Sequence, residues 1–224
     1  MNASVQLPED DLPHRSGSSG SGGRPPDRTK DTAILEAARA SFFERGFTAS
    51  TIEDIAARAG VSKVTVYKRF SDKEALFEAT VRGEMARMEQ AFDDGPGREG
   101  PLADRLNGFG VVLLRFLFSP AHLALDRILA QDLAQSPGLA RRFFDAGPGH
   151  CRARVAALLA DAASVGDITI DDPLLAAADL FALWRGFLEK ELEFGLIDAV
   201  DDPLITARVE RGTRHFMKMV TPSN

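Results

Sequence analysis

The chain has 224 residues, of which 44% are hydrophobic and 27% are charged, and its formal net charge is −6. This composition excludes a disordered or fibrous protein. The sequence has no cationic start followed by an apolar core, no uninterrupted apolar run of about eighteen residues, and a single cysteine, Cys151; we therefore expect a cytoplasmic protein without a membrane span or a disulfide framework.

The first 27 residues contain a tract rich in Ser, Gly and Pro between His14 and Pro26. Such a tract has almost nothing apolar to bury and is typical of a flexible segment. We therefore predict an N-terminal arm over residues 1–27 and folded structure from residue 28 onwards.

Two short helices joined by a tight turn are predicted from Thr51 to Phe70. Thr51 and Ser62 each stand where a helix N-cap is needed, and Gly60 can take the left-handed conformation that ends a helix. Apolar residues at helical spacing form the buried stripes of the two helices: Ile52, Ile55, Ala56 and Ala59, then Val66 and Phe70. The pattern is that of a helix-turn-helix.

The outer face of the second helix carries side chains that suit a DNA major groove. At about 100° per residue, Val64 and Lys68 lie opposite the buried side, with Thr65 and Tyr67 beside them. Thymine methyls, base-edge acceptors and phosphates are natural partners for these methyl, ammonium and hydroxyl groups. The alternative is an ordinary helical hairpin whose outer face is only solvated.

Helices are also predicted on both sides of the motif. An amphipathic helix over residues 34–47 is stopped at Gly46. A longer helix begins at Ser71, which stands in capping-box spacing with Glu74, and keeps its apolar stripe as far as Phe92. A helix of this length can join two domains.

The charge is divided unequally along the chain. From Arg24 to Arg82 there are eleven Lys and Arg against nine Asp and Glu, a net charge of +2, whereas residues 83–224 carry −6. Affinity for a duplex depends on local neutralisation of phosphates, so an acidic remainder does not exclude DNA binding.

The remainder shows helical spacing and no strand alternation. Five helices are predicted there: residues 102–117, one from Ser119-Pro120, one from Pro137 with a break or bend near residues 147–149, one from Asp172-Pro173 to Gly195, and one from Asp202-Pro203. The predicted fold is all-α with nine helices. A three-helix head over residues 28–81 is joined by the long helix to a helical bundle over residues 82–224.

The head resembles the TetR family. Its shared pattern is met by Thr51, Ile55-Ala56, Ala59-Gly60-Val61-Ser62, Tyr67, Phe70 and Lys73-Glu74-Ala75-Leu76. The resemblance implies a bacterial transcriptional regulator, most simply a repressor, that binds operator DNA as a homodimer and leaves it when a small molecule binds the other domain.

This resemblance suggests roles for the residues of the head. Phosphates would be held by Thr51, Ser62, Tyr67 and Lys73, and base edges or the groove rim would be faced by Lys63, Val64, Thr65 and Lys68. The arm has two interpretations. Either Arg15, Arg24 and Arg28 reach an adjacent minor groove, or the arm is a passive tail.

The body resembles the C-terminal domain of AefR-like TetR regulators through Ala130 to Pro148 and Gly166 to Pro173. This implies a lipophilic or aromatic effector, and it agrees with a dimer interface on the last two long helices. Large rings that can line a pocket are Phe109, Phe116, Phe143, Trp184 and Phe187, with Arg115, Asp132 and Arg185 as orienting groups. The alternative is that these rings are core and these charges are surface.

No cofactor, metal or catalytic motif is predicted. His14, His122, His150 and His215 are scattered without metal-ligand spacing, and no nucleophile elbow or phosphate-binding glycine loop occurs. Cys151 is either a packing residue or a redox sensor. Two rival functions stay open: an activator or constitutive DNA binder with the same head, and an all-helical binding module that does not touch DNA.

Overall fold

The computed structural model describes residues 28–95 and 100–221. These residues form helices and no strand, which confirms the all-α prediction. The helices are α1 (Arg28–Ala49), α2 (Ile52–Arg58), α3 (Lys63–Arg69), α4 (Lys73–Asp93), α5 (Leu102–Leu117), α6 (Pro120–Gln135), α7 (Pro137–Ala146), α8 (Pro148–Ser164), α9 (Pro173–Arg185), α10 (Leu188–Glu193) and α11 (Asp202–Val220).

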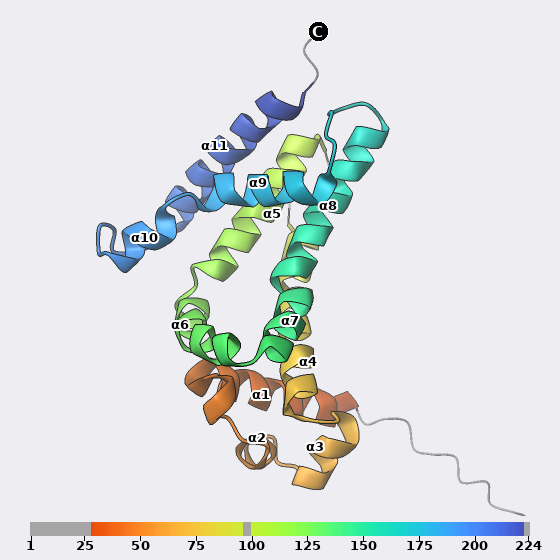
Figure 1. The fold of residues 1–224 in the computed structure, drawn as a ribbon, viewed down its shortest axis with the longest axis vertical. Helices are drawn as coiled ribbons and strands as arrows, with labels where there is room; N and C mark the ends of the chain where they lie inside the picture. The colour runs from red at the N-terminus through yellow and green to blue at the C-terminus, as the bar shows by residue number, and fades with distance from the viewer. Residues whose placement is uncertain (1–27, 96–99, 222–224) are drawn as a thin grey trace, which may run out of the picture.

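The molecule is elongated (Figure 1). Helices α1 to α3 form a head at one end, α5, α8, α9 and α11 pack together at the other, and α4 runs between them. Helices α6 and α7 lie where the two parts meet, and α6 packs directly against α1. The prediction of a head joined by a long helix to a helical bundle is therefore confirmed.

The turns of the head form as the local sequence predicts. The Thr51 hydroxyl accepts from the Asp54 amide at 3.1 Å, and the Ser62 hydroxyl accepts from the Thr65 amide at 3.2 Å. Gly60 has a φ of 66°, the left-handed conformation that lets the chain turn between α2 and α3. Gly46 has a φ of 80° and ends the regular part of α1, as predicted.

The start of α4 differs from the prediction. The helix begins at Lys73, and its N-cap is Asp72, whose carboxylate accepts from the Ala75 amide at 2.6 Å. Ser71 therefore precedes the cap and donates its hydroxyl to Asp72 at 3.1 Å. The carboxylate displaces the hydroxyl because a charged acceptor binds an N-terminal amide more strongly.

Two of the helices predicted in the body are each divided, so eleven are found in the described ranges where nine were predicted. The break expected near residues 147–149 is present, with Gly147 outside helical geometry between α7 and α8. The continuous helix predicted as far as Gly195 is wrong. It ends at Arg185 because Gly186 has a φ of 49°, and the guanidinium of Arg208 occupies the space that a Cβ at Gly186 would fill.

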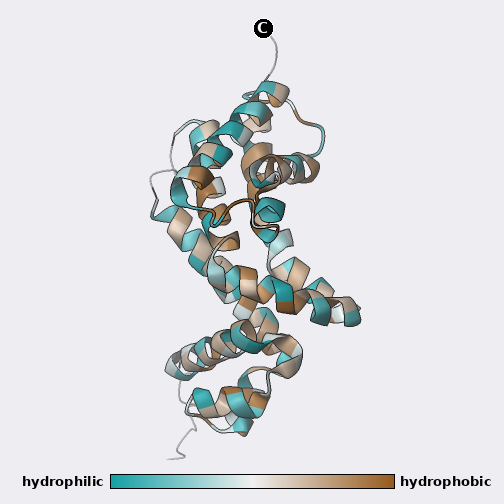
Figure 2. Cartoon of the chain, turned by 90° about the vertical axis from the view of Figure 1, so that its left-hand side faces the viewer, coloured by the Kyte–Doolittle hydropathy of each residue, from teal (hydrophilic) through white to brown (hydrophobic). Residues whose placement is uncertain are grey.

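The buried apolar residues form two clusters. Figure 2 colours hydrophobic residues brown along the helices of both the head and the body. The head cluster joins α1 to α4, as far as Val81, with Leu125, Leu129 and Leu139 from α6 and α7. The body cluster starts on α4 at Met85 and includes the buried Trp184. The two cores thus adjoin within one turn of α4.

No single helix in the described part of the chain is long and apolar enough to cross a membrane. Helices α5 and α6 together have the necessary length and composition, but they are bent by 65° where they meet.

Candidate functional site

The outer face of α3 is open to solvent. Val64 is 62% exposed, Tyr67 and Lys68 are also exposed, and Thr65 is half-buried. On the opposite side, Val66 is fully buried and Phe70 packs against the head core. The structure therefore brings the predicted groove-facing side chains together on one free surface.

The hydroxyl groups predicted to hold phosphates also organise the turn. Ser62 Oγ lies 2.9 Å from Thr65 Oγ1 in addition to capping α3. Thr51 caps α2 in the same way. Both side chains are exposed, so these contacts orient them without burying them.

The three lysines predicted to meet DNA are in different environments. Lys68 has no ion-pair partner among the described residues. Lys63 bonds to Glu53 across the turn, and this carboxylate raises the pKa of the ammonium. Lys73 donates to the Thr48 carbonyl at 3.2 Å and lies 4.3 Å from the centre of the Phe47 ring, where burial lowers its pKa. Among the residues that the structure describes, Lys68 is therefore the cation of the α3 face without an ion pair.

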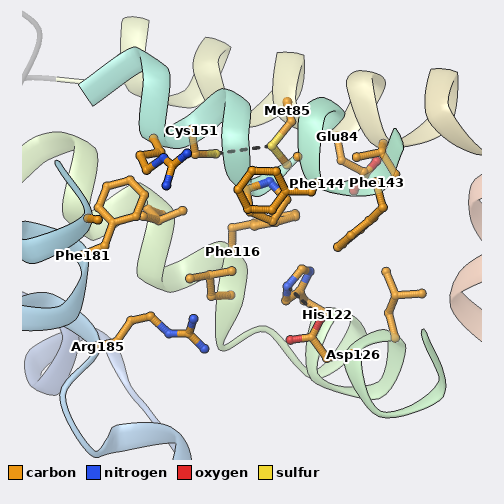
Figure 3. A pocket seen from close by; sticks show the side chains of 18 of the residues that line it. Glu84, Met85, Phe116, His122, Asp126, Phe143, Phe144, Cys151, Phe181 and Arg185 are labelled. Carbon is orange, nitrogen blue, oxygen red and sulfur yellow. Dashed lines mark hydrogen bonds and ion pairs between the residues drawn. The ribbon is translucent and has the colours of Figure 1, made fainter. Parts of the chain in front are cut away.

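A cavity of about 440 Å³ lies between the head and the body (Figure 3). Helices α1 and α4 supply one side of its wall and α5 to α9 supply the rest. Its volume is in the range of small-molecule sites. The wall is mostly apolar and aromatic, with five polar residues among those that line it: Glu84, His122, Asp126, Arg152 and Arg185.

Two of the five rings predicted for a pocket lie in this wall, namely Phe116 and Phe143. Phe109 and Trp184 are instead fully buried in the body core, where the Trp184 indole donates to Thr213 at 3.0 Å. Phe187 is 76% exposed on the surface of the body, because the chain turns at Gly186 and α9 does not continue.

Of the three predicted orienting groups, only Arg185 borders the cavity. Arg115 forms a two-pronged ion pair with Asp202, at 2.8 and 3.0 Å, on the body surface. Asp132 lies outside the wall and binds the end of α1, accepting from the backbone amides of Phe47 and Thr48 at 2.8 and 3.1 Å.

Sequence reasoning missed Glu84 and His122, the two polar residues of the wall that are almost fully buried. The Glu84 carboxylate accepts from Arg39 of α1 at 2.8 Å and also from Arg87, which in turn binds Glu36 of α1. A signal was present: Glu84 falls in the buried stripe of α4 between Val81 and Met85, where a carboxylate needs partners.

Like Glu84 on α4, His122 falls in the buried apolar stripe of its helix, α6, one turn before Leu125. Its ring lies 4.5 Å from the Phe116 ring, and its Nε2 lies 3.5 Å from the Asp126 carboxylate. Burial lowers the pKa of His122, although Asp126 opposes this shift. The lowered pKa favours the neutral form of the imidazole in the cavity wall.

Cys151 also borders the cavity, with its Sγ 3.4 Å from the Met85 sulfur. Burial raises the pKa of the thiol to about 12, so the reactive thiolate is scarce. This favours the packing interpretation of Cys151. Within the described ranges, no three His, Cys, Asp or Glu side chains are placed to hold a metal ion. His14 and the arm residues Arg15 and Arg24 lie outside these ranges.

Two family models match the chain. The model of bacterial regulatory proteins of the tetR family matches residues 34–80, and that of the C-terminal domain of AefR-like transcriptional repressors matches residues 104–219. The second match alone covers more than half of the chain.

Curated relatives match mainly in the head. The chain is 50% identical over 54 residues to the HTH-type transcriptional regulator YdeS of Bacillus subtilis, which is 24% of this chain and 27% of that protein. It is 30% identical over 105 residues to the HTH-type transcriptional repressor KstR2 of Mycobacterium tuberculosis, which is 46% of this chain and 52% of that protein. The chain thus matches about a quarter to a half of the length of these relatives.

Solved structures match over nearly the whole length. The flavonoid-responsive regulator FrrA is 32% identical, with a TM-score of 0.72, over 88% of this chain and 99% of that one. A TetR-family transcriptional regulator from Mesorhizobium loti is 25% identical, with a TM-score of 0.72, over 89% and 100%. Together with the exposed α3 and the two family models, these matches show that the chain belongs to the TetR family of DNA-binding transcriptional regulators.

Proposed function

We propose that the protein is a homodimeric repressor that leaves its operator when a lipophilic or aromatic molecule occupies the cavity. The observation that carries this proposal is the composition of the cavity wall, which includes Phe43 of α1 and Glu84 of α4 as well as helices of the body. An occupant of this cavity would therefore contact the head and the body at once. The aromatic wall and the likeness to a flavonoid-responsive regulator both support an aromatic effector.

Binding of DNA is assigned to α3 and its flanks. Two recognition helices of a dimer would enter successive major grooves, about 34 Å apart or somewhat more. Val64 and Lys68 point outward to face base edges, with Lys63 and Thr65 beside them, and Thr51, Ser62, Tyr67 and Lys73 are assigned to phosphates. Of these, Lys63 and Lys73 would each have to share or exchange an existing partner.

Association of two copies is assigned to the surface of α9 to α11. Phe187, Phe194 and Leu196 are each at least 70% exposed there, although they are large and apolar. Large apolar side chains exposed close together in the chain are typical of an interaction surface. This supports a dimer formed through the last helices of the body. In this proposal residues 28–81 are the DNA-binding unit, residues 82–224 are the ligand-binding and dimerisation unit, and residues 1–27 are the arm.

We assign the switch to two sets of contacts that connect the cavity wall with α1. On one route, Glu84 binds Arg39 directly. On the other route, α6 connects the two parts: its residue His122 lines the cavity, and its residue Asp132 binds the end of α1. A ligand that prefers one position of α4 or α6 would re-aim α3, and a preference of about 1–3 kcal/mol is enough for regulation.

The test uses the full-length protein and the DNA that flanks its own gene. We expect fluorescence anisotropy to report binding that weakens as salt rises, and a hydroxyflavone to release the DNA. The variant Ala178→Phe narrows the cavity from α9 and should keep DNA binding while losing release. Absence of binding at low salt would overturn the proposal. A reporter gene that falls silent on addition of the effector would show an activator instead.

A further inference from the structure

His122, one of the residues that line the cavity, carries a buried atom without the partner that its chemistry requires. The Nδ1 of His122 is buried, and no described residue forms a hydrogen bond with it. The whole residue is only 7% exposed. Buried polar atoms without a partner are rare in proteins, and one carried by a residue that lines a cavity is a candidate to bind a group of the occupant.

The position of Asp126 determines whether that atom donates or accepts. The Asp126 carboxylate faces Nε2 of the imidazole at 3.5 Å, and an ionised carboxylate can only accept. In the neutral ring the proton is therefore favoured on Nε2, which leaves Nδ1 as an acceptor. Arg185 supports the neutral ring by lowering the pKa of His122, whereas Asp126 and Glu84 act the other way and burial dominates.

The neighbouring groups indicate what kind of molecule would bring the missing donor. The Phe116 ring lies 4.5 Å from the imidazole, and Phe143, Phe144 and Phe181 complete an aromatic wall (Figure 3). A second buried atom without a partner, Nε of Arg152, is a donor in the same wall. Among the described residues that line the cavity, the buried polar atoms without a partner are thus one acceptor and one donor, and several rings stand beside them.

We propose that the effector is an aromatic molecule with a phenolic hydroxyl, and that His122 Nδ1 accepts the hydrogen of this hydroxyl while Arg152 donates to an oxygen elsewhere on the molecule. This inference rests on the proposed function, because it specifies the effector of that cavity. An aliphatic alcohol could donate the hydrogen bond but has no ring to pack against the aromatic wall. A carboxylate can only accept, so it would place a second acceptor against Nδ1.

The test compares three matched probes by calorimetry on the full-length protein: 7-hydroxyflavone, 7-methoxyflavone and flavone. The methyl ether removes the hydrogen, and flavone removes the oxygen without adding bulk. We expect the phenol to bind at least about tenfold more tightly than either analogue, as a net hydrogen bond to a buried acceptor predicts. A second pair, 4-hydroxybiphenyl and 4-methoxybiphenyl, tests the same preference on a smaller frame.

Variants then assign the preference to one residue. His122→Phe keeps a ring against Phe116 but has no acceptor, and it should bind phenol and flavone within about twofold of each other. His122→Asn keeps an acceptor and should retain part of the preference. His150→Phe is the control, since His150 of α8 binds Glu89 of α4 outside the wall and its loss should change nothing.

Three results would overturn the inference. The first is equal binding of the phenols and their analogues, and the second is no binding of either phenol. The third is an unchanged preference for the phenol in a His122→Phe protein that circular dichroism shows to be folded. DNA binding is measured on the same samples. Release of DNA by flavone and phenol alike would leave the repressor proposal intact and refute only the role of the hydroxyl.

Discussion

Asp132 of α6 holds the end of α1, because one of its carboxylate oxygens accepts from the backbone amides of both Phe47 and Thr48, at 2.8 and 3.1 Å. The Thr48 hydroxyl donates to the other oxygen. Gly46 makes this approach possible, since a Cβ there would overlap Ile128 of α6. Ten residues earlier on the same helix, about 15 Å away, His122 lies in the cavity wall. One rigid helix therefore spans the distance from the cavity to the head.

This relationship predicts that Asp132→Ala uncouples the two sites. Removing the carboxylate leaves two amides and a hydroxyl without their acceptor and should lower the free energy of unfolding by about 1–3 kcal/mol. Affinity for a cavity ligand, measured by calorimetry, should stay within about twofold of the parent, whereas the ligand should release DNA less effectively. Asp132→Asn keeps an acceptor and should behave nearly as the parent. Normal release by a folded Asp132→Ala would show that α6 does not transmit the signal.

The phosphate role of Tyr67 can be tested by removing one atom. Tyr67→Phe keeps the exposed ring on α3 and deletes the hydroxyl. We expect binding to weaken by about threefold to tenfold on every operator sequence alike, as loss of one hydrogen bond to the backbone of DNA predicts. A loss confined to one base position in a binding-site selection would show that Tyr67 reads a base.

Val64 and Lys68 should instead control sequence choice. Both project from α3 opposite the buried Val66, and Lys68 has no competing ion pair among the residues that the structure describes. Replacing either by Ala should shift the preferred bases in a selection experiment, with discrimination changing by about 1–3 kcal/mol at the contacted position. Arg58→Ala is a control, because that side chain belongs to α2 and is held by Glu44 of α1 through two bonds. Preference profiles identical to the parent would remove both residues from base reading.

These head contacts could be anticipated because they are local. Thr51, Gly60 and Ser62 determine their own turns through bonds to residues three positions away, so spacing alone reveals them. The cavity was less predictable. Trp184 and Phe187 share one apolar stripe in the sequence, yet one is fully buried and the other exposed, because Arg208 of α11 packs against Gly186 between them. That contact joins residues far apart in the chain and leaves no local signal.

The partner of Asp132 was unpredictable for the same reason. Its carboxylate binds residues more than eighty positions away in the chain. In the sequence, Asp132 is simply an acidic residue on a stretch of helix that looks exposed. Glu84 and His122 are intermediate cases. Their place within apolar stripes signals burial, but only the packed structure shows that Arg39 meets one and that the other borders a cavity.

The exposed rings of the body predict how two copies associate. Phe187→Glu places a charge at the start of α10, near whose end Phe194 and Leu196 are also exposed, and should shift the protein from dimer to monomer in light scattering, with a matching loss of operator affinity. Val165 is similarly exposed, at 73%, but it is the C-cap of α8, and Figure 1 shows α8 and α10 on opposite sides of the body, so Val165→Glu should remain dimeric. A Phe187→Glu protein that stays a dimer would move the interface to another face.

His122 should make the folded state sensitive to mild acid. Burial lowers its pKa below the ordinary value of 6.5 in the folded protein, so the unfolded chain binds the proton more readily. Where the unfolded state binds more protons, stability rises with pH. The free energy of unfolding should therefore begin to fall as the pH drops through about 6.5 and go on falling until it passes the folded pKa.

The groups that face the ring are Asp126, Glu84 and Arg185. Denaturant titrations of the parent and of His122→Phe across this range isolate the effect, because the variant lacks the titrating ring but keeps those three neighbours. A loss of stability equally steep in both proteins would assign the acid sensitivity to other groups.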